Sequence, residues 1–325
     1  MKSFTRTALL LASACLGLSV LRAADPDAIV AADGSAQYKT VQAAINAAPQ
    51  NTTADHVWTI LVKPGTYREI VYIQREKHFM RLVGEDAATT VITHNLNASA
   101  IGPDGEKIGT FRTPTVQIDA DDFTVENLTL ENAAGPTGQA LAVRVDGDRV
   151  AFRNCRFLGW QDTIFINRGR QYFENCYIAG ATDFIFGGAT AWFENCEIAI
   201  AGNGYITAAS TPADVACGFV FNHCRITAKK DGLKTFLGRP WRPYASTIFL
   251  HTEMASVVRA EGWQNWSRPE REKTTRYSEF ASTGPGANDS ARVAWARPLT
   301  DTEASAITVA RVLGGADRWQ PAGGR

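Results

Sequence analysis

Phe152-Arg153-Asn154-Cys155 recurs three times, with small changes, in the middle of this 325-residue chain. The cysteines of the four copies are 20–28 residues apart, and the later copies are Phe173-Glu174-Asn175-Cys176, Phe193-Glu194-Asn195-Cys196 and Phe221-Asn222-His223-Cys224. A repeat of this length is typical of a solenoid, in which each coil stacks on its neighbours. Equivalent residues of adjacent coils would then lie about 4.8 Å apart. We therefore expect each repeated position to form a row along the molecule.

The pattern of apolar residues before these repeats favours strands over helices. Short runs rich in Val and Ile, separated by Gly, Pro and Asn, predict strands at residues 58–62, 70–73, 80–83 and 90–92. No stretch between them reads as a crossover helix, so we expect an all-β fold in which one parallel sheet is wound into a helix. Stacked Asn side chains at the turns would hydrogen-bond from coil to coil.

Short helices are expected only at the ends of the solenoid. The Ala-rich segment 41–48 has apolar residues at helical spacing and would cap the open N-terminal end. Segment 300–315 begins with the acidic residues Asp301 and Glu303 and predicts a C-terminal helix or cap.

Residues 1–24 have the features of a secretory signal peptide: an early Lys2, an apolar run at 8–20 and small residues at the end. We expect its removal to leave a catalytic domain of residues 25–325 that is secreted or periplasmic. Lipid attachment at Cys15 is the alternative, which Ala12-Ser13-Ala14 disfavours because it is a poor attachment box.

Charge and cysteine usage narrow the class of protein. Loss of Lys2, Arg6 and Arg22 with the signal peptide would change the formal charge from 0 to −3, which gives no basic excess for nucleic acid or a lipid surface. The repeated cysteines are expected to form a row of small buried thiols, whereas Cys217 is outside the pattern and could pair with a neighbour. No Cys-x-x-Cys or His-x-His cluster indicates a metal site.

Two aspartates occupy the same place in successive repeats. Asp162 follows Cys155 by seven residues, and Asp183 follows Cys176 by seven residues. Stacking would bring the two carboxylates together, and since like charges cannot both ionise cheaply, one pKa should rise. Such a pair supplies a nucleophile and an acid or base, although turn aspartates on a solenoid would show the same spacing.

Three further residues point to acyl transfer. Arg239, between Gly238 and Pro240, could hold one aspartate ionised. Gln139 and Gln161 offer neutral amide donors for an oxyanion that forms only during attack on a carbonyl. With neither a Ser-His pair nor a metal motif, the set suggests a carboxylate nucleophile.

Five segments, in this order, resemble the signature segments of the pectin methylesterases, and the resemblance extends from about residue 33 to residue 321. They are Gly65-Thr66-Tyr67-Arg68-Glu69, Gln139-Ala140-Leu141, Gln161-Asp162-Thr163-Ile164, Asp183-Phe184-Ile185-Phe186-Gly187 and Leu237-Gly238-Arg239-Pro240-Trp241. The resemblance, which we assign to the bacterial secreted type, implies a right-handed parallel β-helix that acts as a monomer. It also implies demethylation of pectin, the methyl-esterified polygalacturonate, without a cofactor or metal.

The resemblance also implies roles for matching residues. Asp183 would attack the methyl ester, and Asp162 would protonate departing methanol and then activate water. Gln161, assisted by Gln139, would bind the oxyanion, and Arg239 would hold Asp183. Substrate contacts would come from Thr110, Gln139, Phe186, Arg239 and Trp241. A structural role is favoured for Tyr67 and Glu69, and Trp263 and Trp266 are candidates for lining the cleft.

Other functions remain open at this point. Polygalacturonases and pectate lyases share the β-helix, but their aspartate sets or calcium sites fit these residues poorly. A related esterase or thioesterase with a non-pectin substrate is a stronger alternative, because fold and nucleophile do not determine the acyl group. An inactive envelope protein that binds polysaccharide is disfavoured, since it need not retain all five catalytic candidates.

Overall fold

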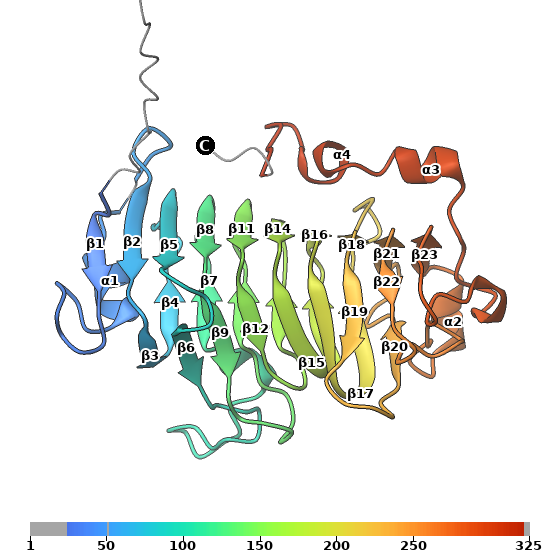
Figure 1. Ribbon diagram of the computed structural model, residues 1–325, viewed down its shortest axis with the longest axis horizontal. Helices are drawn as coiled ribbons and strands as arrows, with labels where there is room; N and C mark the ends of the chain where they lie inside the picture. The colour runs from blue at the N-terminus through green and yellow to red at the C-terminus, as the bar shows by residue number, and fades with distance from the viewer. Residues whose placement is uncertain (1–24, 51, 322–325) are drawn as a thin grey trace, which may run out of the picture.

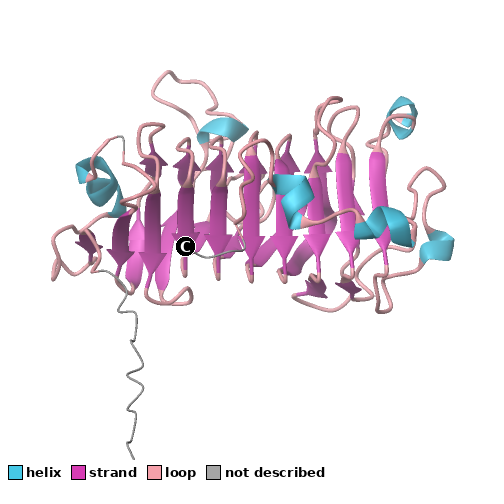
Figure 2. Cartoon of the chain, turned by 90° about the horizontal axis from the view of Figure 1, so that it is seen from above, coloured by secondary structure: helices cyan, strands magenta, loops and turns pink. Residues whose placement is uncertain are grey.

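The computed structural model describes residues 25–50 and 52–321, and the expected signal peptide and Cys15 lie outside the described residues. The chain winds into a stack of coils whose named strands pair only in parallel with their neighbours (Figure 1). This is the parallel β-helix expected from the repeats, and its hand is right-handed. The helices lie outside the stack (Figure 2).

One wall of the helix is a ten-stranded sheet. Its strands, in spatial order, are β1 (Ala28–Val30), β2 (Trp58–Val62), β5 (Met80–Gly84), β8 (Phe123–Glu126), β11 (Val150–Arg153), β14 (Arg170–Glu174), β16 (Thr190–Glu194), β18 (Phe219–Asn222), β21 (Ser246–Leu250) and β23 (Arg276–Phe280).

The other thirteen strands form two walls that are joined through the long strands β15 (Tyr177–Gly187) and β17 (Glu197–Ala209). The second wall contains the first parts of β15 and β17 together with β3 (Gly65–Arg68), β6 (Thr90–His94), β9 (Thr129–Asn132), β12 (Arg156–Leu158), β19 (Arg225–Ala228) and β22 (Glu253–Met254). The third wall contains their last parts together with β4 (Val71–Ile73), β7 (Val116–Ile118), β10 (Val143–Val145), β13 (Ile164–Ile166) and β20 (Thr235–Gly238). The strands predicted from sequence at 58–62, 70–73, 80–83 and 90–92 correspond to β2, β4, β5 and β6.

The repeated phenylalanines fill the interior as one continuous stack. Neighbouring rings along this row are stacked with centroids 4.4–4.8 Å apart, in the order Phe152, Phe173, Phe193, Phe221 and Phe249. The strand register pairs each of them with the next, as in Phe173 opposite Phe193. The repeat therefore sets both the register of the coils and the packing of the core.

The cysteine row is also present. Cys155, Cys176, Cys196 and Cys224 are free and buried, and each thiol donates to a carbonyl of the preceding coil, as Cys155 does to Val125 at 3.4 Å. The predicted stack of buried thiols is confirmed. Cys217 is likewise free in the described part of the chain, so the structure does not form the disulfide considered for it.

The repeated asparagines are explained mainly by the backbone of the turn, and less by the expected hydrogen bonds between stacked amides. Asn127, Asn154, Asn175 and Asn195 all have a left-handed backbone, with φ between +51° and +54°, and His223 takes the same place at φ +50°. Asparagine tolerates this conformation better than most residues because its short side chain causes less strain. A hydrogen bond between stacked amides joins Asn154 to Asn127, at 3.2 Å. The backbone of the turn is thus what all copies share.

Helix α1 (Val41–Ala47) caps the N-terminal end as predicted. Its first turn is held by Glu69, whose carboxylate accepts from the backbone amides of Val41 and Gln42 at 2.8 and 2.9 Å. Lys77 donates to the Ala48 carbonyl at the other end. The structural role favoured for Glu69 is confirmed, and Tyr67 is buried with its hydroxyl donating to the Lys63 carbonyl.

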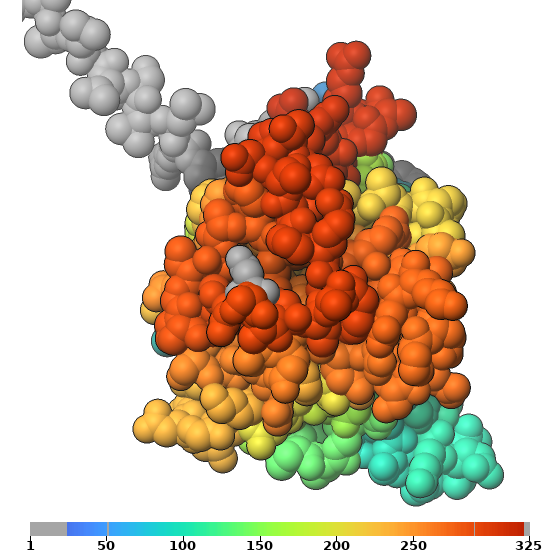
Figure 3. All heavy atoms as spheres, turned by 90° about the vertical axis from the view of Figure 1, so that its right-hand side faces the viewer, coloured from blue at the N-terminus to red at the C-terminus, as the bar shows by residue number. Residues whose placement is uncertain are grey.

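The C-terminal segment is helical, as predicted, but it does not cap the solenoid. It forms two short helices, α3 (Asp301–Ser305) and α4 (Val309–Leu313), and runs back along the outside of the ten-stranded sheet (Figure 1). Leu313 is buried in an apolar cluster with Tyr172 and Trp192, which explains why the segment lies there. The C-terminal end of the solenoid is covered instead by the loops that precede α3 and contain α2 (Pro269–Glu272) (Figure 3). No helix in the described ranges is long and apolar enough to cross a membrane.

Candidate active site

Asp162 and Asp183 lie at the same place on adjacent coils. The register pairs Gln161 with Thr182 and Ile164 with Ile185, so the two aspartates between these pairs are stacked neighbours. Both have a left-handed backbone, at φ +65° and +51°, which aspartate accepts better than most residues do. The predicted juxtaposition of the two carboxylates is therefore present.

Both carboxyl groups are withdrawn from water. Asp162 is 8% exposed and Asp183 is 5% exposed. Burial, reinforced by the charge of Asp183 and opposed by Arg239, raises the pKa of Asp162 to about 8. Burial also raises the pKa of Asp183, but the hydrogen bonds and charge of Arg239 oppose this rise. Near neutral pH the shared proton is therefore on Asp162, and Asp183 is the ionised partner.

Arg239 binds Asp183 through both carboxylate oxygens. Its Nε donates to Oδ1 at 2.9 Å and its Nη2 donates to Oδ2 at 2.6 Å. The guanidinium group lies between two aromatic rings, 3.8 Å from the centroid of Tyr205 and 3.7 Å from that of Trp266. A planar, delocalised cation suits both the bidentate contact and the stacking, which a lysine could not reproduce. Arg239 thus fixes the direction and the charge of the Asp183 carboxylate.

We expect Asp162→Asn to stabilise the fold increasingly as pH rises. The pKa of Asp162 is higher in the folded chain than in the unfolded chain, so its contribution to stability is present at low pH and is lost as pH rises through about 8. The asparagine side chain does not ionise, so its burial carries no such free-energy cost at high pH. In chemical denaturation at several pH values, the free energy of unfolding of the variant should exceed that of the unaltered chain by a margin that grows from about pH 4 to pH 8. A margin independent of pH would contradict the assignment of the proton to Asp162.

Gln139 and Gln161 stack beside the carboxyl pair. Isolated parallel bridges connect Gln139 to Gln161 and Gln161 to Thr182, so the two amides occupy successive coils, one residue before the aspartate position. Both side chains are partly exposed. Amide donors in this position can stabilise negative charge that forms on a carbonyl oxygen.

An aromatic cluster adjoins the carboxyl pair on the third wall. Phe165 and Phe186 stack at 4.7 Å, and Trp241 lies edge-on to Phe186 at 5.7 Å. Phe111, which is 44% exposed, contacts Phe165 from the loop that carries Thr110. The structure thus brings the predicted residues Phe186 and Trp241 into contact, and Thr110 precedes Phe111 in the adjoining segment. Phe165 and Phe186 are themselves buried, so Phe111 and Trp241 form the more exposed part of this cluster.

Sequence reasoning missed three of the aromatic residues at this site. Phe165 follows Asp162 by three residues, as Phe186 follows Asp183, so the repeat itself could have identified it. Tyr205 and Phe111 carry no comparable signal, because they reach the site through the register of β17 and through a loop.

The two candidate tryptophans lie in different environments. Trp266 stacks on Arg239 and belongs to the site. Trp263 does not line the cleft, so this expectation was wrong. Its side chain is 1% exposed and packs on Tyr277, and its indole donates to Glu279 at 3.0 Å.

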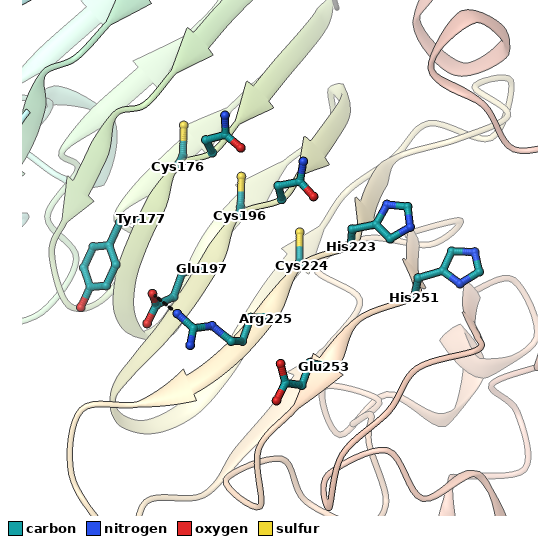
Figure 4. A pocket seen from close by; sticks show the side chains of 11 residues that line it. Cys176, Tyr177, Cys196, Glu197, His223, Cys224, Arg225, His251 and Glu253 are labelled. Atoms are coloured by element: carbon teal, nitrogen blue, oxygen red, sulfur yellow. Dashed lines mark hydrogen bonds and ion pairs between the residues drawn. The ribbon is translucent and has the colours of Figure 1, made fainter.

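A concave surface lies at a different edge of the solenoid from the carboxyl pair. It is an open groove of roughly 610 Å³ at the asparagine and cysteine turns. Figure 4 shows Glu197, Arg225 and Glu253 in a row parallel to the cysteines, with His223 and His251 on the other side of the cysteine row. The groove does not contain the carboxyl pair and shows no comparable catalytic arrangement. No group of three or more His, Cys, Asp or Glu side chains suited to a metal ion occurs in the described residues.

Comparison with known proteins agrees with this geometry. The Pectinesterase family model matches residues 27–316. Pectinesterase 31 of Arabidopsis thaliana is 42% identical over 281 residues, which cover 85% of this chain and 88% of that protein. Putative pectinesterase 11 of the same plant is 38% identical over 292 residues, which cover 89% of this chain and 79% of that protein.

Solved structures show the same architecture. Pectin methylesterase from carrot has a TM-score of 0.85 and 34% identity, covering 91% of this chain and 95% of that one. A pectin methylesterase in complex with a hexasaccharide has a TM-score of 0.80 and 31% identity, covering 92% of this chain and 99% of that one. A buried carboxyl pair on a parallel β-helix thus defines a class of carboxylate-based hydrolase. Within that class, the chain belongs to the pectinesterase family.

Proposed function

We propose that this chain hydrolyses the methyl esters of pectin to give pectate and methanol. Membership of the pectinesterase family supports the substrate class. The observation that carries the chemistry is the pairing of Asp183 with Arg239 beside the protonated Asp162. An ionised and oriented carboxylate next to a carboxylic acid is what ester cleavage without a metal requires.

The first half of the proposed reaction is acylation. The Asp183 carboxylate attacks the ester carbonyl, and the negative charge on its oxygen is stabilised by the amides of Gln161 and Gln139. The bond to the methoxy group then breaks, and Asp162 gives that group its proton, so that methanol leaves. The result is an anhydride between Asp183 and the sugar carboxyl group.

The second half is hydrolysis of the anhydride. Asp162, now a carboxylate, takes a proton from water while the hydroxide adds to the sugar carbonyl. The bond to Asp183 breaks, which restores its carboxylate and releases the galacturonic acid unit, which then loses its proton to water. Thr110, Phe186 and Trp241 would contact the polymer, and Phe165 supports them by stacking on Phe186.

The site of action is part of the proposal. Removal of residues 1–24 would place the enzyme outside the cytoplasm, where its polymeric substrate occurs, and we propose that it acts there as a monomer. The plant relatives do not support assignment to the bacterial secreted type, which stays a prediction from the sequence.

Methanol release from methylated pectin tests this function. The unaltered chain should release one methanol for each carboxylate formed and leave the length of the polymer unchanged. Shortening of the polymer would indicate attack on the glycosidic bond. If other acyl esters were cleaved but pectin released no methanol, the chain would be an esterase of different substrate class.

A further inference from the structure

A buried hydroxyl group connects the two segments that carry Thr110 and Gln139. Thr113 is fully buried and caps the C-terminal end of the short 3-10 helix η1 (Thr110–Arg112). Its Oγ1 donates to the Thr110 carbonyl at 2.7 Å and accepts from the backbone amide of Leu141 at 3.0 Å. Leu141 lies two residues after Gln139, so one hydroxyl group holds the ends of both segments together.

The backbone around Gln139 has its other hydrogen bonds to the active site and to the same loop. The amide of Ala140 donates to the Gln161 carbonyl at 3.1 Å. The Gln139 carbonyl accepts from the amide of Ala98 at 2.9 Å, and Ala98 belongs to the loop of residues 96–113. The position of Gln139 therefore depends on the neighbouring coil and on this loop together.

A buried amide reinforces the connection. Asn132 is buried, and its Nδ2 lies within hydrogen-bond distance of three carbonyls, those of Leu96, Thr113 and Leu141, at 2.9, 3.2 and 3.0 Å. Its Oδ1 accepts from the amide of Ala134 at 3.1 Å. Buried polar networks of this kind make the local structure rigid when their members are satisfied. The loop and the backbone after Gln139 are thus fixed to each other by side chains that solvent does not reach.

This rigidity matters because of what Gln139 has to do. An amide stabilises an oxyanion only when it lies about 3 Å from the position that the oxygen reaches during the reaction. A small displacement of the segment would move the Gln139 amide out of that range. Valine at position 113 has the shape of threonine but would leave the buried amide of Leu141 without its acceptor, which favours such a displacement.

We propose that Thr113 is a positioning residue, which acts on the reaction by holding Gln139 and Thr110 in place. This inference rests on the proposed function, because Thr113 is buried and performs no chemistry of its own. Its influence on the chemical step passes through Gln139, whose amide acts on the oxyanion, and its influence on substrate binding passes through Thr110. The sequence alone does not show this role, since the contact between Thr113 and Leu141 spans 28 positions.

The test compares Thr113→Val with Thr113→Ser and with a matched control, Thr115→Val. Thr115 is also fully buried, and its hydroxyl group donates to the Glu131 carbonyl in β9 at 2.8 Å. On methylated pectin, Thr113→Val should lower kcat for methanol release about five- to ten-fold. Thr113→Ser keeps the hydroxyl group and should stay within about a factor of two of the unaltered chain, as should Thr115→Val. Circular dichroism shows which variants are folded, and Thr113→Ala replaces Thr113→Val if the latter is not.

A double-mutant cycle separates positioning of Gln139 from a general loss of stability. When Gln139→Ala is already present, Thr113→Val should change kcat by less than about a factor of two, because the amide that it displaces is gone. An equal effect of Thr113→Val with and without Gln139 would overturn the inference, as would a loss of kcat in Thr115→Val as large as that in Thr113→Val.

Hydrogen exchange followed by mass spectrometry provides a readout that does not depend on activity. Thr113→Val should speed the exchange of the Leu141 amide and of residues 96–113 by at least about three-fold, whereas Thr115→Val should leave both unchanged. Equal exchange in these two variants would contradict the proposed link. If the unaltered chain released no methanol from pectin, the proposed function would fail, and the exchange measurement would still decide whether Thr113 holds the two segments together.

Discussion

Asp183→Asn should lower kcat on methylated pectin by about 10⁴-fold or more, because the amide cannot act as the nucleophile. The exchange keeps the shape of the side chain. It also suits the backbone, since asparagine accepts the φ of +51° at this position. The fold should therefore persist, which circular dichroism and thermal unfolding can verify beside the methanol assay.

Asp122→Asn is the matched control for this variant. Asp122 also has a left-handed backbone, at φ +52°, and both of its carboxylate oxygens also accept from one arginine, with Arg149 Nε and Nη2 each at 2.7 Å. It directly precedes β8 of the ten-stranded sheet and is not part of the active site. Its substitution should cost stability and leave kcat within about a factor of two. Activity of Asp183→Asn comparable to that of this control would exclude Asp183 as the nucleophile.

Arg239→Ala should lower kcat/KM at neutral pH by at least about 10²-fold, since it removes the charge partner of the buried Asp183. Without the guanidinium group, the pKa of Asp183 is no longer held down, and the two aspartates compete for one proton. The acid limb of the pH–rate profile should therefore move to higher pH, and part of the lost rate should return as pH rises.

Arg239→Lys separates charge from geometry. It keeps a positive charge near Asp183 but loses the bidentate contact and the stacking between Tyr205 and Trp266. Its acid limb should shift less than that of Arg239→Ala, and its kcat should stay below that of the unaltered chain at every pH. An acid limb that stayed in place in Arg239→Ala would mean that Arg239 serves packing or substrate binding only.

The contacts between coils that the sequence predicts correctly are those that repeat. The rows of Phe173, Cys176 and Asn175 follow from the period, and the same period brings Asp162 and Asp183 together without any knowledge of the fold. A parallel register repeats every contact from coil to coil, so one correct alignment of repeats predicts many neighbours.

The features that the sequence does not predict arise where the chain departs from the repeat. Tyr205 reaches Arg239 through β17, whose register with β15 is irregular. The burial of Trp263 and the contact of Arg271 with the Pro240 carbonyl depend on how the non-repeating C-terminal loops fold over the last coils. Contacts of this kind have no period, so composition and spacing carry little information about them.

The row of asparagines was predicted correctly from the repeat, but hydrogen bonding explains it only in part. Stacked amides were expected to hydrogen-bond along the row, yet the property common to all copies is a backbone φ near +50°, including at His223. The residue type is therefore selected mainly by backbone strain at the turn.

The most direct measurement of the proposed mechanism uses a galacturonate oligomer whose carboxyl group is esterified with nitrophenol. Nitrophenolate is a good leaving group and needs no proton from Asp162, so acylation of Asp183 can proceed without the acid. Rapid mixing of this ester with Asp162→Asn should give a burst of one nitrophenolate per chain, followed by very slow turnover because no base activates water. Asp183→Asn should give no burst. A full burst from Asp183→Asn, or none from Asp162→Asn, would contradict the assignment of nucleophile and acid to these two residues.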